Sequence, residues 1–402
     1  MEFLEKLLDG HAVKWVTLGS VSDIGTGSSN RQDESENGIY PFYVRSKKIL
    51  KSDTFEFDEK AIVIPGEGGI GEIFHYVEGK YALHQRAYRI RIKSDAVNTK
   101  FLYHFMSSGF KSYILMRSVG ATAISIRKPM LENFQIPIPY ADNPKKSLEI
   151  QAEIVRILDV FTELTAELTA ELTARKKQYS YYRDQLLSFK EGDVEWKALG
   201  EVGGFVRGKR FTKADYVEDG ISVIHYGEIY TRYGVSTTHA YSQVRKDMAG
   251  SLRYAEPGDV VITDVGETVE DVGKAVAWLG DGKVAIHDHC YAFRHSMNPK
   301  FVSYCMQATS FVAEKAKYIA RTKVNTLLIP GFSRIKIPIP YPGDPDKSLA
   351  EQARIVSILD KFDALIHFIS EGLPREIELR QKQYEYYRDL LLSFPKPEEV
   401  AA

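Results

Sequence analysis

The sequence predicts an α+β fold in which two β-rich globular regions are joined to two long helices through an internal repeat. The motif IPIPY occurs twice, at Ile136–Tyr140 and at Ile337–Tyr341. Each copy is followed by a stretch with apolar residues at steps of three and four, which is typical of a helix. Runs with alternating apolar and polar residues precede each copy, and these are typical of strands. The chain is therefore one globular-plus-helical unit present twice.

The repeat is circular. An amphipathic lead ends in LLDG, which stands before VKW as LLSFKEG stands before VEW later in the chain. The N-terminus thus corresponds to the end of a unit that begins near the C-terminus, which indicates a pseudo-two-fold relation between the halves. The predicted parts are the lead 1–12, a first globular region 13–146, a helix 147–192, a second globular region 193–347, a helical region 348–395 and a tail 396–402.

The first globular region opens with VKWVTLGSV and closes with IPIPY, which its prolines keep extended. Alternating runs between these motifs predict strands, glycines mark the turns, and a helical spacing follows the last strand. The expected elements are strands at Tyr40–Val44, Ala61–Ile64, Glu72–Val77 and Ala87–Ile92, turns around Gly66–Gly71 and at Glu78–Gly79, and a helix at Thr99–Tyr113.

The first long helix is expected over Ser147–Phe189, which has no internal glycine or proline. At ~1.5 Å per residue it is roughly 65 Å long, too long for one small domain to cover. Ser147 is a candidate N-terminal cap, and the low-complexity tract TELTAELTAELTA lies at Thr162–Ala174. We interpret the helix as one side of a coiled coil, with a spacer between two domains as the further hypothesis. Its expected apolar stripe consists of Leu148, Ala152, Val155, Leu158, Phe161, Leu164, Leu168 and Leu172.

The second half follows the same plan with two differences. The offset between the halves is 181 at the tryptophans and 201 at IPIPY, so about twenty extra residues are expected after Gly220. DVVITDVGET and GKVAIHD correspond to strand-forming runs of the first half, and a helical stretch is expected at Val302–Tyr318. Gly372 and Pro374 interrupt the second long helix, where they should stop or kink it.

Composition excludes several classes of protein. The chain has 402 residues, 44% of them hydrophobic, which is ordinary for a globular protein of two or three domains. It has no apolar leader and no run of eighteen apolar residues, so we expect a cytoplasmic protein without a membrane span. The net charge of −1 does not by itself suggest a nucleic-acid binder. However, residues 13–146 carry 19 Lys and Arg against 14 Asp and Glu, so the first globular region is basic.

Motifs for catalysis, cofactors and metals are weak or missing. Gly66, Gly68 and Gly71 match a dinucleotide fingerprint, but a strand-like run follows where a helix would be needed, so a tight glycine turn is the better interpretation. His84, His287, His289 and Cys290 lack the spacing of a metal cage. The sequence contains no G-x-S-x-G, no P-loop and no Pro-Pro dipeptide of a DNA methyltransferase active site. We therefore expect no catalytic residues and no metal.

Positive residues gather in clusters in both globular regions, beside Ser, Thr and Tyr. Such clusters suit contacts to phosphates and base edges, although any one of them could be a solvated face. The clusters also include Lys51, Lys93, Arg207, Lys213, Lys315 and Lys317. The predicted DNA contacts are Arg45, Lys47, Lys48, Arg89, Arg91, Arg117, Thr122, Ser125, Arg127 and Lys128 in the first region, and Lys209, Arg210, Arg232, Arg321, Thr322 and Lys323 in the second.

A second shared motif, KQYxYYRDxLLSF, ends each helical region, beginning at Lys177 and at Lys382. Tyr and Arg are enriched at interfaces, so the motif suits a partner protein, which would then bind in two copies. Packing of helix on helix is the alternative interpretation. The predicted partner contacts are Tyr179, Tyr182, Arg183, Leu186, Tyr384, Tyr387, Arg388 and Leu391.

Together these motifs resemble the DNA specificity subunit of type I restriction–modification systems, known as HsdS. The resemblance is carried by VxWxxLGxV, IPIP, KSLxxQAxIVxILDxF and KQYxYYRDxLLSF in both halves and covers nearly the whole chain. The tandem TAEL units are similar to those of the IC-type subfamily. The likeness is weakest within the globular regions, where members of the family differ because they read different DNA sequences.

The resemblance implies that each globular region is a target recognition domain that reads one half of a bipartite site in double-stranded DNA. It implies that the two conserved helices pack as an antiparallel coiled coil and hold the domains apart. Catalysis would belong to partners: two modification subunits that use S-adenosylmethionine to methylate adenine N6, and restriction subunits that use ATP and magnesium. This chain would bind no cofactor of its own.

Two alternatives remain at the level of the sequence. The chain could be a non-catalytic coiled-coil scaffold with lectin-like domains, or a stand-alone DNA-modifying enzyme. Salt-dependent duplex binding that needs a methyltransferase partner would exclude the first, and methyl transfer by the isolated chain would support the second.

Overall fold

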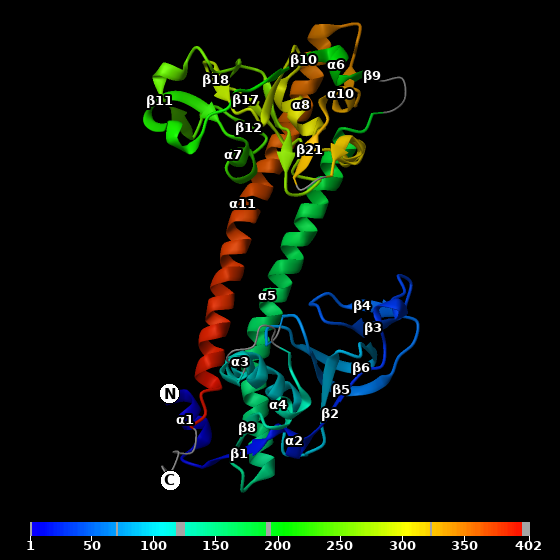
Figure 1. Ribbon diagram of the computed structural model, residues 1–402, viewed down its shortest axis with the longest axis vertical. Helices are drawn as coiled ribbons and strands as arrows, with labels where there is room; N and C mark the ends of the chain where they lie inside the picture. The colour runs from blue at the N-terminus through cyan, green and yellow to red at the C-terminus, as the bar shows by residue number, and fades with distance from the viewer. Residues whose placement is uncertain (1, 70, 118–124, 190–193, 322–323, 396–402) are drawn as a thin grey trace. The chain divides into compact units, whose positions relative to one another are not determined.

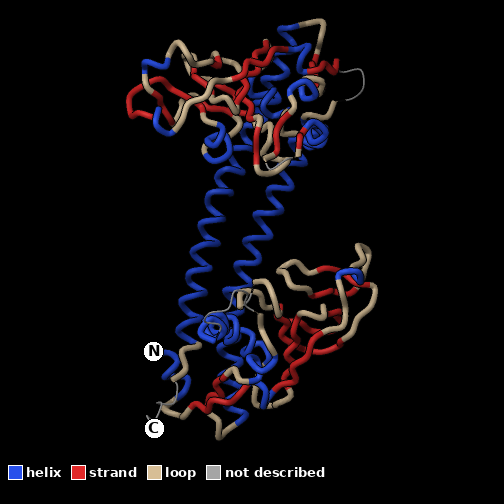
Figure 2. The backbone as a smooth tube through the Cα atoms, viewed as in Figure 1, coloured by secondary structure: helices blue, strands red, loops and turns tan. Residues whose placement is uncertain are grey.

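The computed structural model describes residues 2–69, 71–117, 125–189, 194–321 and 324–395. The chain divides into two compact units, residues 1–170 with 373–402 and residues 171–372. The long helices α5 (Pro144–Leu186) and α11 (Pro345–Leu391) each contribute residues to both units. Figures 1 and 2 show the helices and strands of each unit.

The first unit is built on a sheet with strand order β2–β7–β5–β6–β3–β4. Neighbouring strands are antiparallel except β3 and β6, which are parallel. Helix α3 lies against β5 and β6 (Figure 1). The elements that precede α5 are α1 (Glu2–Leu8), β1 (Val13–Thr17), α2 (Leu18–Val21), β2 (Ser22–Thr26), the 3-10 helix η1 (Arg31–Asp33), β3 (Tyr40–Tyr43), β4 (Leu50–Ser52), β5 (Phe57–Pro65), β6 (His75–Leu83), β7 (Ala87–Ile92), α3 (Thr99–Arg117), α4 (Lys128–Glu132) and β8 (Gln135–Pro139).

One core joins the sheet of this unit to the long helices. The buried face of α3 packs against the β5 and β7 isoleucines, and Ile150, Ile154 and Leu158 present the start of α5 to the same cluster at steps of four. Leu4 and Leu8 of the N-terminal lead and Leu391 at the end of α11 complete it. The two chain ends therefore share a core in the first unit, as the circular repeat predicts.

The second unit holds the strand orders β10–β19–β15–β17–β12, β13–β11–β18–β14 and β16–β21–β20. Its elements between α5 and α11 are β9 (Val194–Ala198), α6 (Leu199–Val202), β10 (Gly203–Arg207), η2 (Lys213–Asp215), β11 (Tyr216–Ile224), α7 (Tyr226–Thr231), β12 (Ser236–Thr237), β13 (Ser242–Val244), η3 (Lys246–Met248), β14 (Tyr254–Ala255), β15 (Val260–Thr263), β16 (Val265–Gly266), β17 (Ala275–Trp278), β18 (Val284–Ile286), β19 (Cys290–His295), α8 (Pro299–Cys305), α9 (Thr309–Lys315), η4 (Ala316–Tyr318), β20 (Ile319–Ala320), β21 (Asn325–Leu327), α10 (Ile329–Phe332) and β22 (Lys336–Pro340).

The repeat motifs pair with each other in both units. The VKW strand β1 pairs antiparallel with the IPIP strand β8, and the VEW strand β9 pairs in the same way with β22. Most of the extra residues of the second unit lie between β11 and β15, where α7, β12, β13 and β14 stand. The corresponding loop of the first unit, between β3 and β5, contains β4.

Two sequence expectations about strands and helices are wrong. The turn at Glu78–Gly79 does not form, because β6 starts at His75 and pairs with β5 straight through this point. Gly79 has φ +98°, a conformation that glycine adopts without steric cost, so the strand continues. The helix at Val302–Tyr318 is two short helices, α8 and α9, with a break at Met306–Ala308.

The long helices also depart from expectation. Helix α5 starts at Pro144, where the Asn143 side chain accepts a hydrogen bond from the Lys146 amide at 3.1 Å, so Ser147 lies inside the helix and is not its cap. Ala152 is exposed, so it does not belong to the buried stripe. Helix α11 runs through Gly372 and Pro374 without ending, although the proline has no N–H to donate. None of the helices in the described part of the chain combines the length and apolar character needed to cross a bilayer.

Candidate nucleic-acid interface

Three loops meet at one end of the sheet in the first unit. Arg45 follows β3, Glu67 follows β5, and Ser125 precedes α4. Arg45 Nη1 donates to Glu67 Oε2 at 3.1 Å, and Glu67 forms an isolated antiparallel bridge with Ser125. The Ile126 amide donates to the Gly66 carbonyl at 2.8 Å. Residues that are far apart in the sequence are therefore held together here by both side-chain and backbone bonds.

Glu67 holds a second guanidinium at the same oxygen. Arg86 Nη1 donates to Glu67 Oε2 at 3.1 Å. The hydrogen bond from Arg86, with a smaller contribution from Arg45, lowers the pKa of the Glu67 carboxyl, so the group is ionised at neutral pH. A hollow of about 350 Å³ beside this cluster is lined in part by Arg45, Lys48 and Gly68.

The glycine-rich loop after β5 serves close packing. Gly68, Gly69 and Gly71 have φ of +72°, +57° and +69°, which side chains disfavour. A Cβ on Gly71 would stand 2.6 Å from the Lys111 Cα of helix α3. Strand β6 follows the loop, so no helix N-terminus is available for a pyrophosphate. The structure thus confirms the glycine turn and contradicts a dinucleotide site.

Arg89 does not behave as a DNA contact. Its Nη2 donates to Asp23 at 2.7 Å and its Nη1 to Glu59 at 3.2 Å, and its side chain is 15% exposed. The guanidinium therefore neutralises carboxylates of neighbouring strands inside the sheet, which corrects the prediction for this residue.

The other predicted DNA contacts of the first unit differ in their exposure and in their contacts within the chain. Arg117 ends α3 with its guanidinium 4.1 Å from the centroid of the Tyr113 ring. Ser125 is partly exposed beside the glycine loop, and Thr122 lies outside the described residues. The remaining predicted DNA contacts are all exposed: Lys47, Lys48, Arg91, Arg127 and Lys128.

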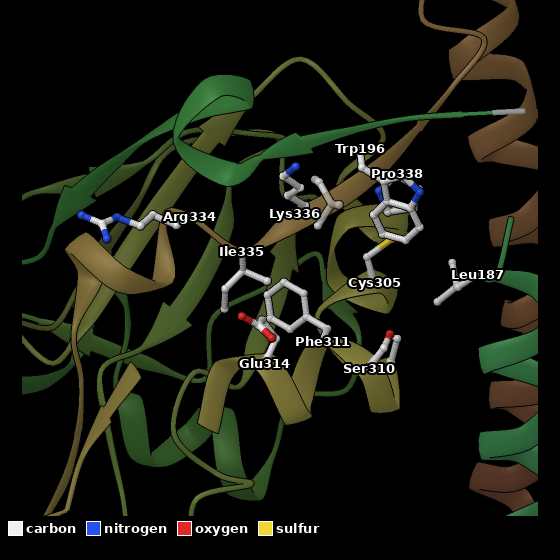
Figure 3. Close-up of a pocket in the computed structure, with 12 residues that line it drawn as sticks. Leu187, Trp196, Cys305, Ser310, Phe311, Glu314, Arg334, Ile335, Lys336 and Pro338 are labelled. Carbon is white, nitrogen blue, oxygen red and sulfur yellow. The ribbon is translucent and has the colours of Figure 1, made fainter. Parts of the chain in front are cut away.

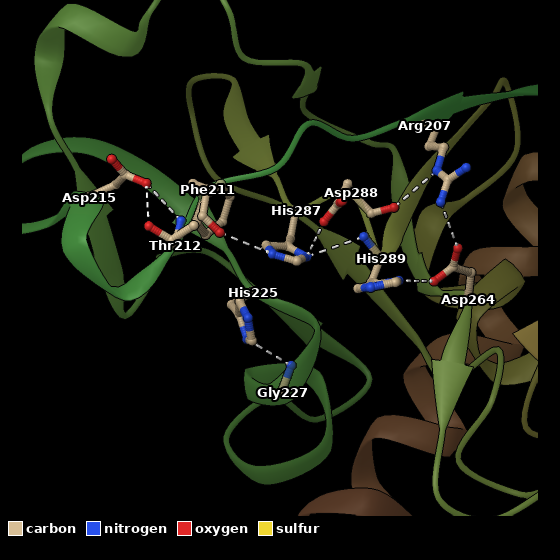
Figure 4. A network of polar contacts seen from close by, with 10 residues as sticks. All are labelled: Arg207, Phe211, Thr212, Asp215, His225, Gly227, Asp264, His287, Asp288 and His289. Atoms are coloured by element: carbon tan, nitrogen blue, oxygen red, sulfur yellow. Dashed lines mark hydrogen bonds and ion pairs between the residues drawn. The ribbon is translucent and has the colours of Figure 1, made fainter. Parts of the chain in front are cut away.

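The second unit places a polar network at the corresponding end of its sheet (Figure 4). Asp264 directly follows β15, and its carboxylate is 5% exposed. His289 Nδ1 lies 3.0 Å from Asp264 Oδ1, and Arg207 Nη2 lies 3.5 Å from Asp264 Oδ2. Burial raises the pKa of the Asp264 carboxyl, and the hydrogen bond to His289 opposes that shift. Arg207 Nε also donates to the Asp288 carbonyl at 3.1 Å.

His287 supports this network from within. Its Nε2 lies 3.2 Å from the Phe211 carbonyl oxygen, and its Nδ1 accepts a hydrogen bond from the His289 amide at 3.2 Å. Burial lowers the pKa of His287 to about 4, so the ring is neutral at pH 7 and the Nε2 proton is donated to Phe211. His287 therefore fixes the backbone that carries His289.

The histidines and cysteines do not form a metal site. Among the described residues no group of three or more His, Cys, Asp or Glu side chains could hold a metal ion. Cys290 and Cys305 are free and buried, and burial raises the pKa of both thiols. Both cysteines are part of the core of the second unit.

The basic residues of the second unit fall into three groups. Lys209 and Arg210 are exposed just after β10, and Arg232 caps α7 with its guanidinium 5.3 Å from the centroid of the Tyr241 ring. Arg321 is exposed, whereas Thr322 and Lys323 lie outside the described residues. Lys315 is buried and donates to the Glu270 carbonyl at 3.0 Å, so it is not part of a basic surface. Burial lowers its pKa to about 8.

Comparison with known proteins assigns the family. The model of the type I restriction modification DNA specificity domain matches residues 12–175 and 191–379. The chain belongs to this family. The specificity subunit is the non-catalytic part of a type I restriction–modification enzyme, so the comparisons favour this function over a scaffold protein or a stand-alone enzyme.

Individual relatives match this specificity subunit along its whole length. It is 34% identical to the EcoR124I/EcoR124II specificity subunit of Escherichia coli, over 100% of this chain and 99% of the relative. It is 29% identical to the putative specificity subunit S.HindORF215P of Haemophilus influenzae, over 98% of each. The solved S subunit from M. genitalium shares the fold, with a TM-score of 0.53 at 18% identity over 97% of this chain and 98% of the other. The predicted family and fold class are confirmed, and the IC-type subfamily stays a prediction.

The tyrosine motif of the specificity subunit packs largely against its own chain. In the second unit the Tyr179 hydroxyl donates to Asp363 at 3.3 Å, Tyr182 stacks on Phe362, and Arg183 is buried beside Asp184. Leu186 packs on the same unit's core. In the first unit Tyr384, Tyr387, Arg388 and Leu391 take the equivalent inward or half-buried positions. Tyr182 is the most exposed of these eight residues, and their role as partner contacts stays a prediction.

Sequence reasoning missed the tyrosine that does face outward. Tyr181 is 60% exposed and its repeat equivalent Tyr386 is 66% exposed. Both belong to the KQYxYYRD motif, one residue before the stacked tyrosine. Residue 181 lies about 100° around the helix from residue 182, so the two tyrosines face different ways, but the sequence does not show which of them faces outward. A large exposed aromatic in each copy of the motif is the feature that fits a partner protein.

Each unit also has an apolar groove where the motif strands meet the helix end. Figure 3 shows the groove of the second unit, of about 350 Å³, with Trp196, Cys305, Phe311 and Leu187 around it. The first unit has a corresponding groove of about 800 Å³. Its lining includes Trp15, Phe105, Phe134, Leu392 and Phe394. The LLSF ends of the repeat thus pack beneath the tryptophan-bearing ribbon in both units.

Proposed function

We propose that the specificity subunit reads a bipartite site in double-stranded DNA, with residues 13–146 reading one half and residues 193–347 the other. The observation that carries the proposal is the duplication itself, together with the match to a specificity subunit over the whole chain. Two copies of one recognition domain suit two half-sites, because each copy presents the same end of its sheet with basic side chains around it.

We propose as DNA contacts the exposed basic residues of these ends together with Ser125. The basic residues are exposed and Ser125 is partly exposed, so they can reach phosphates and base edges without unfolding the domain. Arg89 is left out because its side chain is only 15% exposed and its guanidinium is held between Asp23 and Glu59. Thr122, Thr322 and Lys323 stay predictions. The proposed contacts are Arg45, Lys47, Lys48, Arg91, Arg117, Ser125, Arg127 and Lys128, then Lys209, Arg210, Arg232 and Arg321.

We propose that the long helices set the distance between the half-sites, because each domain is bonded rigidly to its helix. In the first unit Lys100 of α3 lies 2.5 Å from Asp159 of α5, and Gln151 of α5 accepts from the Asn98 amide at 2.8 Å. These bonds should make the domain follow any rotation of the helix that carries it.

The second unit repeats the attachment. Lys300 lies 2.6 Å from Asp360 of α11, and Gln352 accepts from the Asn298 amide at 2.9 Å. The bonded residues stand at equivalent positions of the repeat, which supports one shared role in holding a domain on a helix.

We propose that two modification subunits bind, one at each copy of the tyrosine motif around Tyr181 and Tyr386. S-adenosylmethionine, ATP and magnesium would be used by the modification and restriction subunits, and adenine N6 would be the methylated atom. The support is the equivalent exposure of the two tyrosines in the two units.

Exchange of one domain tests the proposal. Residues 203–336 would be replaced by the equivalent segment of a relative, and the variant purified with its modification subunits. Methylated adenines mapped on genomic DNA should show one half-site changed and the other intact. Changes in both half-sites, or no bipartite site for the unchanged protein, would refute it.

A further inference from the structure

We propose that a carboxylate just after one equivalent strand in each domain positions the side chains that read bases: Glu67, after β5, holds Arg45 and Arg86 in the first domain, and Asp264, after β15, holds Arg207 and His289 in the second. The inference rests on the proposed function, that each domain reads one half-site, and adds which residues determine specificity.

The two carboxylates lie at adjacent positions of the repeat, as their backbone bonds show. In the first domain the Gly66 amide donates to the Arg86 carbonyl at 2.9 Å, and Gly66 accepts from Ile126 at 2.8 Å. In the second domain the Asp264 amide donates to the His289 carbonyl at 3.0 Å, and Asp264 accepts from Leu327 at 2.7 Å. Asp264 thus corresponds to Gly66, one residue before Glu67.

Of the two side chains that each carboxylate holds, one comes from an equivalent position of the repeat and the other does not. Arg86 and His289 each stand two residues after a histidine whose Nδ1 accepts their amide, His84 at 3.0 Å and His287 at 3.2 Å. The second partner differs in origin, because Arg45 follows β3 whereas Arg207 ends β10. The arrangement of an anion with two held groups is kept while the chemistry of those groups changes.

The side chains held by the two carboxylates differ more between the halves than the residues that attach the domains to the helices. Most residues that attach the domains to the helices are the same in both halves, as Lys100 and Lys300 or Asp159 and Asp360 show, and the exception is His104 against Tyr304. A purely structural cluster would be under the same packing demand in both copies. A cluster that reads two different half-sites is expected to change in the way observed.

The held groups keep donors and acceptors for DNA. An arginine has five N–H donors, and one Nη atom of Arg45 and one of Arg86 bond to Glu67. A guanidinium fork fits guanine O6 and N7 in the major groove. We therefore assign at least one guanine contact to Arg45 or Arg86 in the first half-site.

His289 offers a different chemistry. Its Nδ1 is occupied by Asp264, and its side chain is 39% exposed, so Nε2 is the ring atom that can meet a base. With the Nδ1 proton donated to Asp264, Nε2 presents a lone pair, which suits an adenine N6 or cytosine N4 amino group. The carboxylate would act by fixing the tautomer and orientation of the ring, so Asp264 is a positioning residue.

The test compares single variants in the complex with modification subunits, scored by methylation of a DNA library randomised at both half-sites. R86A and R86K should each lower discrimination at one or two base pairs of the first half-site by about 5- to 100-fold, because lysine keeps the charge but lacks the fork. H289A should do the same in the second half-site only. E67Q should affect the same base pairs as R86A, more weakly.

A matched control is K60A, since Lys60 forms an exposed ion pair with Glu78 at 2.9 Å on the same sheet. It should leave every position unchanged, and equal melting temperatures of all variants would show that folding is intact. Uniform weakening across all sequences, or R86A and H289A behaving like K60A, would overturn the inference while the bipartite site of the unchanged protein still stood. Absence of a bipartite site in the unchanged protein would instead refute the proposed function.

Discussion

Both units attach a domain to a long helix through an aspartate of that helix, but the side chain that bonds to the aspartate differs between them. In the first unit His104 lies between Asp159 at 3.1 Å and the Tyr384 hydroxyl at 3.2 Å. In the second unit the equivalent residue is Tyr304, whose hydroxyl donates to Asp360 at 2.9 Å. The carboxylate on the helix is kept while its partner changes from imidazole to phenol. The comparison teaches that the carboxylate is the fixed point of the attachment.

Removing that carboxylate should have the largest effect on stability. Asp159→Ala removes the carboxylate partner of His104 and Lys100, and Asp360→Ala removes that of Tyr304 and Lys300. We expect each change to lower the free energy of unfolding by about 2–3 kcal/mol, because partly buried polar groups lose their bonds. Denaturant unfolding of the purified complex measures it.

The control for these variants is Glu153→Ala, which breaks an exposed pair with Arg156 on the same helix. Its cost should be below about 0.5 kcal/mol. If Asp159→Ala costs as little as the control, the attachment is not a fixed point.

Two buried histidines should make the second unit lose stability in acid. Burial lowers the pKa of His287 and His295 to about 4, whereas an unfolded histidine titrates near 6.5. The unfolded chain therefore binds more protons below pH 6.5, so stability that is fully present above pH 6.5 is lost as the pH falls toward 4. Asp288, His225 and His289 are the titrating neighbours of His287.

His287→Gln removes one of these groups. The free energy of unfolding of the variant should fall less steeply between pH 6.5 and pH 5 than that of the unchanged protein, as measured by denaturant titration at each pH. Equal slopes would show that His287 already takes up its proton in the folded state.

Variants of the two exposed tyrosines test the two proposed partner surfaces separately. Tyr181→Ala and Tyr386→Ala should each weaken the binding of one modification subunit by about 1–2 kcal/mol, or roughly 5- to 30-fold in Kd. Each single variant should form a one-to-one complex at concentrations where the unchanged chain binds two subunits. Glu167→Ala, an exposed change elsewhere on α5, is the control. A two-to-one complex of unchanged affinity in both variants would exclude this surface.

The smallest expected effect concerns a position where the domains differ. Arg127 and Leu328 are the N-terminal caps of α4 and α10, and both are exposed. Arg127→Ala should weaken DNA binding across all sequences and lower the salt slope by about one, because one phosphate contact is lost. Leu328→Arg should raise the slope by a similar amount. Loss of reading at a single base pair would identify Arg127 as a base contact.

Local patterns in the sequence predicted the repeat, the long helices, most strands of the first domain and the family. They failed where distant residues decide. Arg89 could not be separated from Arg91 by sequence, because its partners Asp23 and Glu59 come from two other strands. Tyr181 and Tyr182 look alike in the motif, and only the stacking of Tyr182 on Phe362 of the other long helix shows which one faces out.

The sequence predicted which basic residues gather near the proposed DNA-binding end of each sheet, but not how their side chains are arranged. Glu67 attracted no attention as an acidic residue in a basic cluster, although it fixes two arginines. Proline rules predicted a stop or kink at Pro374, yet α11 runs on to Leu391 with one backbone donor fewer.

The central claim is that α5 sets the spacing between half-sites. The helix is continuous through the TAEL tract, where Leu164, Leu168 and Leu172 are half-buried and the Thr165 and Thr169 hydroxyls donate to carbonyls four residues earlier. One added TAEL unit keeps this stripe, lengthens the helix by ~6 Å and turns it by roughly 40° beyond a full turn. That rotation is close to the roughly 35° of one base pair, whose rise is about 3.4 Å.

The deciding measurement is therefore a map of methylated adenines for the protein with one TAEL unit inserted after Leu172, which places the new leucine four residues further along the stripe. Rotation should dominate, because a misaligned domain faces the wrong edge of the groove, whereas a small excess in length can be absorbed by tilting. We predict that the gap between the half-sites grows by one base pair while both half-site sequences stay the same. An unchanged gap would contradict the account, and altered half-sites would show that the helix also shapes the reading surface.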